Sequence, residues 1–430
     1  MLPKRVKLLL LCMAASLTSA CSTPCDAPGK LCAPVSSITS PAPQSRPQPA
    51  PERAPEPPPP AVETFAVPMP NTQNGAAAAP QASQAPQASP DSPAYRIGLM
   101  LPLRSEALRQ HADAVRAGFM AAWERDRDGI AVTLIETGDA AQDVLSVYTG
   151  ALDQQDMIVG PLARSAVTAL AASPQVSKPT IALNHPDGRG ESLLPPQMMV
   201  VGLSIEDEAR QSADWAAREH PDAVAYILSS TVQYQRRSAA AFAAQWQRLG
   251  RTAKIAELNV LNGYLSDGEL VALRARLQSE PSAVLFAGLD SDQARQLRVA
   301  LSAPPLGEIA IYGTSSLNPG KAKQLPGPEL DGVRLLDLPW QLQREHPAVM
   351  VYPQLAGRDA DMERLYALGI DAFRVAREIA LAGARHAPAH FKLDGVTGTL
   401  DVRFGDGPAA FERRELQAIY KGGVPVPVQP

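Results

Sequence analysis

The sequence predicts an α/β protein with two lobes, each built on a doubly wound parallel β-sheet, behind a long disordered tether. Two observations carry this prediction. From residue 94 onward, short and continuously hydrophobic runs alternate with segments of helical periodicity. Before residue 94, the composition shifts to Pro, Ala, Ser and Gln.

The predicted strands are rich in Val, Ile, Leu, Met and Ala, and many of them lack polar alternation. This is expected of parallel strands that helices cover on both faces. We expect strands at residues 95–101, 130–135, 157–159, 180–183, 198–203, 223–228, 253–260, 283–287 and 308–312.

Between the strands, apolar residues recur every three or four positions, which places them on one face of a helix. Ser204, three residues before Asp207, predicts a helix N-terminus. The clearest helical sets are Leu108, Ala112, Val115, Phe119 and Ala122; Ala239, Phe242, Trp246 and Leu249; and Leu365, Leu368, Ala372, Val375, Ile379 and Ala382.

Near the C-terminus, Leu400, Val402 and Phe404 alternate with polar residues and precede a Gly-Asp-Gly turn. This pattern predicts an antiparallel hairpin added to the sheet. We expect a bilobal domain over 94–430, with lobe 1 at about 94–204 and 341–393 and lobe 2 at about 205–340 and 394–430.

The N-terminus has the pattern of a lipoprotein signal peptide over residues 1–20. Basic residues precede a short apolar run and small residues that lead to Cys21, the predicted lipidation site. A signal peptide cut elsewhere and a short membrane anchor are the alternatives, and the run is shorter than the ~20 residues of a spanning helix. Ser22 in place of Asp follows the bacterial sorting pattern for the periplasmic face of the outer membrane.

Residues 21–93 are predicted to be a lipidated, disordered tether, and 17 of the 42 prolines lie in 33–93. Such a segment lets a folded domain work at a distance from its lipid. Cys25 and Cys32 could form a disulfide in an oxidising compartment or remain free thiols.

Composition argues against several functions. The formal net charge of −4 favours neither nucleic acid nor anionic lipid, so the only membrane contact that we expect is the N-terminal lipid. The region after Cys32 has no cysteine, no Gly-x-Ser-x-Gly motif and no phosphate-binding loop. Pro388 separates His386 from His390, which argues against a metal site. We therefore expect no enzymatic activity, no cofactor and no metal.

Polar residues after the predicted strands are candidates for binding a small molecule in a cleft between the lobes, because ligands of open α/β sheets bind beyond the carboxyl ends of strands. The same residue types also cap helices and form turns. The candidates are Ser105, Gly160, Arg164, Ser165, Asn184, Ser229, Ser230, Tyr234, Asp290, Thr314 and Ser315.

Trp340 and Tyr352 flank a Pro-containing polar segment that resembles neither helix nor strand. Exposed aromatic residues are favoured in protein contacts, so both are candidates for contact with a protein partner. Packing in the hinge between the lobes is the equal alternative.

The order of elements resembles the type I periplasmic-binding-protein fold. A narrower resemblance, to the C-terminal domain of the LpoA-type (LppC/YraM-like) penicillin-binding protein activators, rests on eight segments. They are residues 96–103, 158–162, 181–184, 202–211, 241–246, 312–315, 337–340 and 364–373. Two features depart from that family: the tether stands in place of a helical-repeat domain, and 104–108 replaces a loop rich in Gly and Ser.

This resemblance implies a non-enzymatic, lipid-anchored periplasmic regulator that binds and activates a class A penicillin-binding protein, a peptidoglycan synthase. The alternative is a periplasmic receptor for an amino acid, amide or cell-wall fragment, which closes its lobes on the solute.

Overall fold

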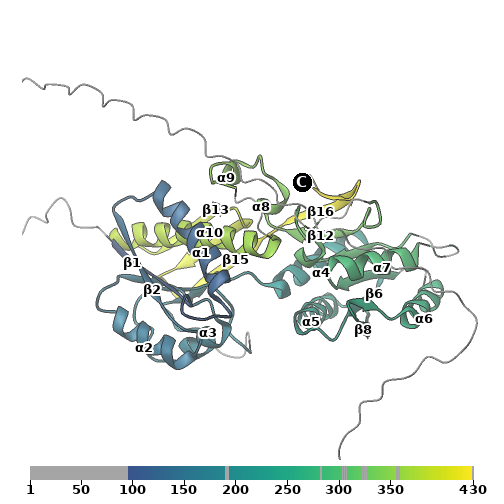
Figure 1. Cartoon of the computed structure of the whole chain (residues 1–430), viewed down its shortest axis with the longest axis horizontal. Coiled ribbons are helices and arrows are strands. Elements are labelled where there is room, and N and C mark those ends of the chain that lie inside the picture. Colours follow the sequence, from purple (N-terminus) through teal and green to yellow (C-terminus); the bar gives the residue numbers. More distant parts are fainter. Residues whose placement is uncertain are drawn as a thin grey trace, which may run out of the picture. The chain divides into compact units, whose positions relative to one another are not determined.

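The computed structural model describes residues 95–188, 193–280, 283–302, 308–321, 327–354 and 359–428, together with 304, 306 and 323 (Figure 1). The predicted signal peptide, lipidation site, tether and Cys25–Cys32 pair lie outside the described residues.

The first sheet has the strand order β2-β1-β3-β4-β5, and all its pairs are parallel. Its interior strand β1 buries Ile97, Leu99 and Leu101 completely. These elements are β1 (Tyr95–Leu101), α1 (Arg109–Arg125), β2 (Ile130–Glu136), α2 (Ala141–Ala151), β3 (Met157–Val159), α3 (Arg164–Ala171), β4 (Thr180–Ala182) and β5 (Met198–Val200).

The second sheet repeats the same order in its parallel part, β7-β6-β10-β11-β12, and adds the antiparallel strands β16 and β17 beside β12. The prediction of two doubly wound parallel sheets is therefore confirmed. The elements are α4 (Ile205–Glu219), β6 (Val224–Ser229), α5 (Gln233–Arg248), β7 (Ala253–Glu257), α6 (Asp267–Gln278), β10 (Ala283–Gly288), α7 (Ser291–Leu301), β11 (Ile311–Gly313), β12 (Arg334–Asp337), β16 (Leu416–Lys421) and β17 (Val424–Pro427).

Shorter elements connect these layers. They are the hairpin of β8 (Val260–Leu261) and β9 (Tyr264–Leu265), the 3-10 turn η1 (Ser315–Leu317), and the one-turn helices α8 (Pro339–Leu342) and α9 (Pro347–Met350). Among the described residues, no helix has both the length and the apolar character needed to cross a membrane.

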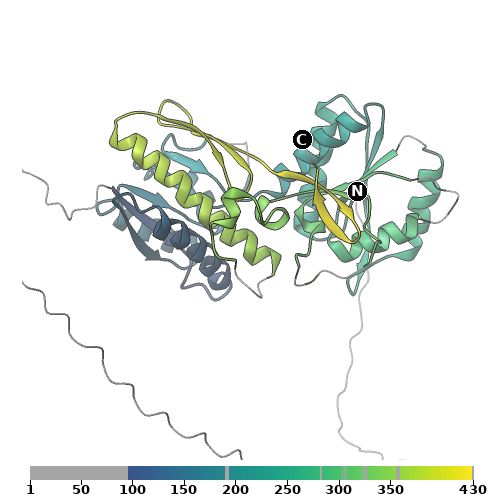
Figure 2. The same cartoon turned by 90° about the horizontal axis from the view of Figure 1, so that it is seen from above.

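The long helix α10 (Ala360–Ala384) belongs to the first lobe, although it follows the second sheet in the chain. Asp359 begins it as a cap, accepting a hydrogen bond from the Met362 amide at 3.0 Å. Figure 2 shows α10 alongside α1. The two helices pack closely: a Cβ atom on Gly369 would lie 2.1 Å from the Val115 carbonyl oxygen.

The C-terminal hairpin differs from its prediction. β14 (Thr399–Phe404) and β15 (Ala410–Arg414) do form an antiparallel hairpin, but with β13 (Ala389–Asp394) they make a separate three-stranded sheet. Leu400, Val402 and Phe404 are buried in the same core as α10. The apolar face of this hairpin therefore keeps it in the first lobe, and the predicted lobe boundary at 393/394 is about 20 residues too early.

The close approach of α1 and α10 predicts a large penalty for a methyl group at Gly369. Gly369→Ala should lower the free energy of unfolding by about 1–3 kcal/mol, since a backbone carbonyl cannot give way. Gly150→Ala, in α2 with no atom within 4 Å of its Cβ position, is the matched control. It should be neutral or slightly stabilising through helix propensity. Urea unfolding measures both variants, and equal stabilities would contradict the packing.

Candidate functional site

The chain passes between the two sheets at three places, and polar contacts tie these places together. The first follows β5 at residues 201–204, the second follows β12 at 338, and the third links β15 to β16 at 415. Ser204 lies in the first crossing and caps α4, accepting from the Asp207 amide at 3.1 Å as predicted.

A buried ion pair stands at the second crossing. Arg364, on α10, donates to both carboxylate oxygens of Asp337, at 3.1 and 2.8 Å. The side chains are 9% and 0% exposed. Arg364 also donates to the carbonyls of Ser315 and Asn318, and the Asn318 amide donates to Asp337. A helix of the first lobe is thereby joined to two segments of the second lobe, the end of β12 and the turn η1.

Glu208, on α4, is a second buried acid next to this pair. It is 5% exposed, and its carboxylate accepts a hydrogen bond from the Ser315 amide at 2.7 Å. Burial raises the pKa of Glu208 to about 7, and the negative charge of Asp337 adds to the effect, whereas Ser315 and Arg364 oppose it. The junction therefore contains a group that takes up a proton near neutral pH.

The first and third crossings are tied by Arg413, on β15. Its guanidinium donates to the carbonyls of Val201 and Gly202 at 2.7 and 2.9 Å and to the Thr397 hydroxyl at 3.0 Å. Thr397 in turn donates to Asp371 of α10 at 2.7 Å. The hinge is thus a connected polar network.

The predicted ligand-binding candidates of the first lobe follow the ends of β1, β3 and β4, as expected. The Ser105 hydroxyl donates to the Asp139 carboxylate at 2.7 Å, and the Ser165 hydroxyl donates to the Asp139 backbone carbonyl at 3.4 Å. Asn184 donates to the Leu162 carbonyl at 3.0 Å.

Two other candidates beside these strands have structural explanations. Gly160 has a φ of +126°, and a Cβ atom there would lie 2.1 Å from the Met100 carbonyl oxygen. Arg164 lies 3.9 Å from Asp187, at ion-pair distance.

The candidates of the second lobe form a network after β6 and β10. The Ser230 amide donates to Gln235, whose side-chain amide donates to the Tyr234 hydroxyl and to Gln293. Asp290 caps α7 in a capping box with Gln293.

Three candidates remain. The Ser229 carbonyl accepts from the Leu258 amide, Thr314 pairs with Ser316 at 2.9 Å, and Ser315 bonds Glu208 and Arg364. Among the described residues, no hydrogen bond joins the candidates of one lobe to those of the other. Most of these groups serve as caps and turns, and their ligand-binding role stays a prediction.

The prediction that Trp340 and Tyr352 are exposed for a partner is wrong. They are 2% and 5% exposed and belong to the core around α10. The Trp340 ring lies 5.2 Å from that of Tyr366, and its amide donates to the Val396 carbonyl. Both aromatic side chains are therefore packed in the interior of the first lobe instead of being exposed to a partner.

Sequence reasoning missed the charges at the hinge. Arg364 and Asp371 share a helical stripe with Leu368 and Val375, at spacings of four, three and four. A charged residue inside an apolar stripe signals a buried, paired group. Nothing local to Arg413 gives a comparable signal, because its two carbonyl partners, Val201 and Gly202, lie more than 200 residues away in the chain.

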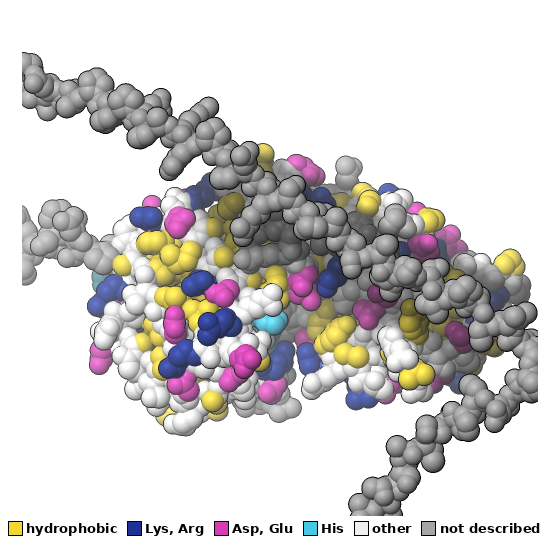
Figure 3. Space-filling model, viewed as in Figure 1, with side chains coloured by type: hydrophobic (Ala, Val, Ile, Leu, Met, Phe, Trp, Pro, Cys, Tyr) yellow, Lys and Arg dark blue, Asp and Glu magenta, His cyan; other side chains and the backbone are white. Residues whose placement is uncertain are grey.

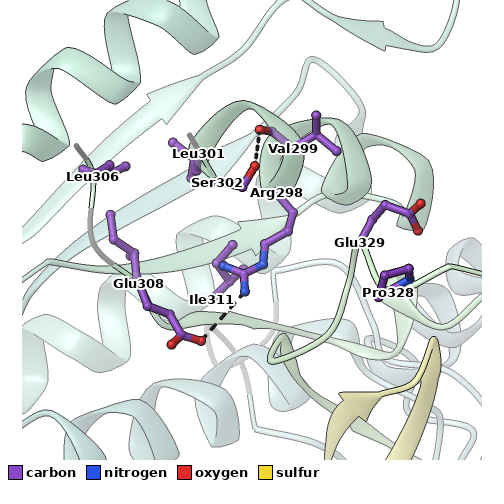
Figure 4. Close-up of a pocket in the computed structure, with 10 residues that line it drawn as sticks. Arg298, Val299, Leu301, Ser302, Leu306, Glu308, Ile311, Pro328 and Glu329 are labelled. Atoms are coloured by element: carbon purple, nitrogen blue, oxygen red, sulfur yellow. Dashed lines mark hydrogen bonds and ion pairs between the residues drawn. The ribbon is translucent and has the colours of Figure 1, made fainter. Parts of the chain in front are cut away.

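Two pockets among the described residues bear on the site. The smaller, about 400 Å³, lies beside α7 in the second lobe, where Arg298 and Glu308 extend toward each other at 3.8 Å (Figure 4). The larger, about 1110 Å³, lies at the hinge and is lined by residues of α3, β5, α4 and β15. None of the predicted cleft candidates lines either pocket.

The surface shows no concentration of one charge on the face visible in Figure 3, where acidic and basic side chains are interspersed. Within the described ranges, no group of three or more His, Cys, Asp or Glu side chains could hold a metal ion.

Two lobes of identical strand order joined by three crossings define the class of two-lobed periplasmic-binding-type proteins. The family model described as "LppC putative lipoprotein" matches residues 61–406, and the chain belongs to this family.

Curated relatives carry the name "Penicillin-binding protein activator LpoA". The relative of Haemophilus ducreyi is 26% identical over 309 residues, covering 71% of this chain and 50% of the relative. The relative of Mannheimia succiniciproducens is 28% identical over 340 residues, covering 77% of this chain and 55% of the relative. The chain thus spans about half the length of the curated relatives it matches.

Solved structures share the fold. A protein of Chromobacterium violaceum described as a "putative branched-chain amino acid ABC transporter" is 34% identical, with a TM-score of 0.60 over 76% of this chain and 100% of that one. The LpoA C-domain of Haemophilus influenzae, described as "a regulator of PBP1A", is 24% identical, with a TM-score of 0.61. The match covers 78% of this chain and 100% of that one. These descriptions are of a putative transporter and of a regulator.

The Arg364–Asp337 pair predicts strong destabilisation when one partner is removed. Asp337→Ala should lower the free energy of unfolding by about 3–5 kcal/mol, because the Arg364 charge loses its buried partner and keeps only the exposed carboxylate of Asp361. The control is Glu257→Ala, which breaks the Arg236–Glu257 pair, with side chains 51% and 45% exposed. It should cost less than about 1 kcal/mol. Similar losses in both variants would contradict the role of the buried pair.

The raised pKa of Glu208 predicts a pH dependence of stability. Between about pH 4.5 and 7 the unfolded state ionises Glu208 while the folded state keeps its proton, so stability falls as pH rises through this window. The unchanged chain should lose roughly 3 kcal/mol of unfolding free energy through Glu208 between pH 4.5 and 7, and Glu208→Gln should abolish this loss. Urea unfolding at a series of pH values measures this, and parallel profiles for the variant and the unchanged chain would contradict it.

Proposed function

We propose that this protein is a lipid-anchored periplasmic regulator that binds and activates a class A penicillin-binding protein. The observation that carries the proposal is its membership of the LppC family, whose curated relatives are named as activators of penicillin-binding proteins. The chain also covers the whole length of a solved C-domain described as a regulator of PBP1A. The shared part is the domain to which that description refers.

The anchor follows from the sequence. The basic N-terminus, the short apolar run and Cys21 fit the word lipoprotein in the family description. With Ser22 after the cysteine, we place the protein at the periplasmic face of the outer membrane. The lipid is then the sole membrane contact, and the proline-rich segment gives the folded domain reach.

Activation by binding requires no chemistry from this chain. A regulator raises the activity of its partner when it binds the active state more tightly than the inactive one. The described polar residues at the strand ends are engaged in caps and turns, and no described cluster suits a metal. We therefore propose that the protein has no catalytic activity, cofactor or nucleic-acid partner.

A solute receptor is the second candidate. The observation that favours it is the 34% identity to a protein described as a "putative branched-chain amino acid ABC transporter", of which this chain covers 100%. Its ligand would lie between the lobes, at the predicted candidates that follow the strands.

The activator proposal predicts faster glycan polymerisation or crosslinking by a cognate class A synthase when the purified chain is added. An increase of at least about twofold needs only ~0.4 kcal/mol of differential binding between the synthase states. Glu257→Ala, a surface change in the second lobe, should stimulate equally. An unchanged synthase rate at a saturating concentration of this chain would contradict the proposal. In that case, saturable binding of L-leucine to the chain by calorimetry would favour the receptor.

A further inference from the structure

The large pocket at the hinge has no role in the proposed function. Its walls come from α3, the segment after β4, β5, the start of α4 and the hairpin of β14 and β15. Its volume of about 1110 Å³ accommodates a small molecule. It is separate from the predicted cleft, because none of the cleft candidates lines it.

Glu415 is the unusual residue of this pocket. It lies at the third crossing and is 9% exposed, and its Oε2 atom has no hydrogen-bond partner among the described residues. Its backbone amide is satisfied by Gln211 at 3.1 Å, so only the carboxyl group lacks a partner. An unsatisfied buried carboxyl costs more than a paired one, and a ligand that supplied a donor would remove this cost.

The basic residues of the pocket are committed elsewhere. The Arg413 guanidinium donates to Thr397 and to two backbone carbonyls of the first crossing. Arg210 is ion-paired with Asp207. Among the described basic residues, none lies within ion-pair distance of Glu415. An added cation would therefore meet an acidic group that forms no ion pair with a described basic residue.

The charges around Glu415 also favour a cation beside it. Burial raises the pKa of Glu415 well above its ordinary value, Glu208, Asp337 and Asp207 raise it further, and Arg413 opposes them. A positive charge beside Glu415 would offset both burial and the neighbouring acids.

The rest of the lining mixes apolar and polar side chains. Leu194, Met199, Pro408 and Phe411 contribute to the walls, beside the acidic end at Glu415. The pocket thus combines a hydrophobic surface with a carboxyl group that lacks a partner, which is the complement of an amphipathic cation.

We propose that the hinge pocket binds a small organic cation, with its ammonium group at Glu415 and its apolar body against Met199 and Phe411. This site is independent of the partner synthase, so binding there can be tested without it.

Calorimetric titration of the full chain with phenethylamine, a primary ammonium with an aromatic body, tests the proposal. The neutral isostere 2-phenylethanol is the matched ligand. We expect saturable binding of phenethylamine and at least about tenfold weaker binding of the alcohol, since a charge-assisted bond is lost. Absence of saturable phenethylamine binding, or equal binding of both compounds, would overturn the proposal.

The variants locate the site. Glu415→Gln keeps the side-chain volume and should weaken phenethylamine binding at least about tenfold. Glu412→Gln is the control, because Glu412 also lines the pocket but is exposed and paired with Arg414 at 3.0 Å. Its affinity should stay within about twofold, as expected for a screened surface charge.

Phe411→Leu gives a second test if Glu415→Gln does not fold, and it should weaken binding several-fold through the lost aromatic contact. In the unchanged chain the affinity should also fall as the pH is lowered, because a protonated Glu415 cannot pair with an ammonium. Unchanged affinity in both Glu415→Gln and Phe411→Leu would show that phenethylamine binds elsewhere and overturn the proposal.

Discussion

The buried pair of Arg364 and Asp337 is the interaction on which the arrangement of this protein depends. It joins a helix of the first lobe to the last parallel strand of the second sheet, where the chain crosses between them. Its geometry is bidentate, and the guanidinium also donates to two backbone carbonyls and to the Asp361 carboxylate, which is what a buried charge requires to be tolerated. Arg413 ties the other two crossings by the same means.

The polar residues at the strand ends differ in their hydrogen bonding from Glu415 beside the large pocket. Asp290, Ser105 and Ser230 sit at strand ends, where ligands of such sheets bind, but their hydrogen bonds already serve caps and turns. Glu415 differs, because its carboxyl group is buried without a partner beside a large pocket.

Much of the fold could be predicted from local patterns, because parallel strands and amphipathic helices leave periodic signals. The apolar stripe of α10 and the Ser204 cap are examples. Long-range packing left no such signal. The hairpin at Leu400 looked like an extension of the second sheet, and Trp340 looked exposed because its segment has no regular period; both are buried against α10. The pairing of Arg413 with carbonyls about 210 residues away could not be read locally.

The central claim is that the buried Arg364–Asp337 ion pair fixes the distance between the two lobes. Pulsed electron paramagnetic resonance between spin labels at Gly150 on α2 and Val271 on α6, with native cysteines replaced by serine, tests it most directly. The account predicts one narrow distance distribution in the otherwise unchanged chain and a broadened or shifted one in Asp337→Ala. Identical distributions in a folded Asp337→Ala chain would contradict it.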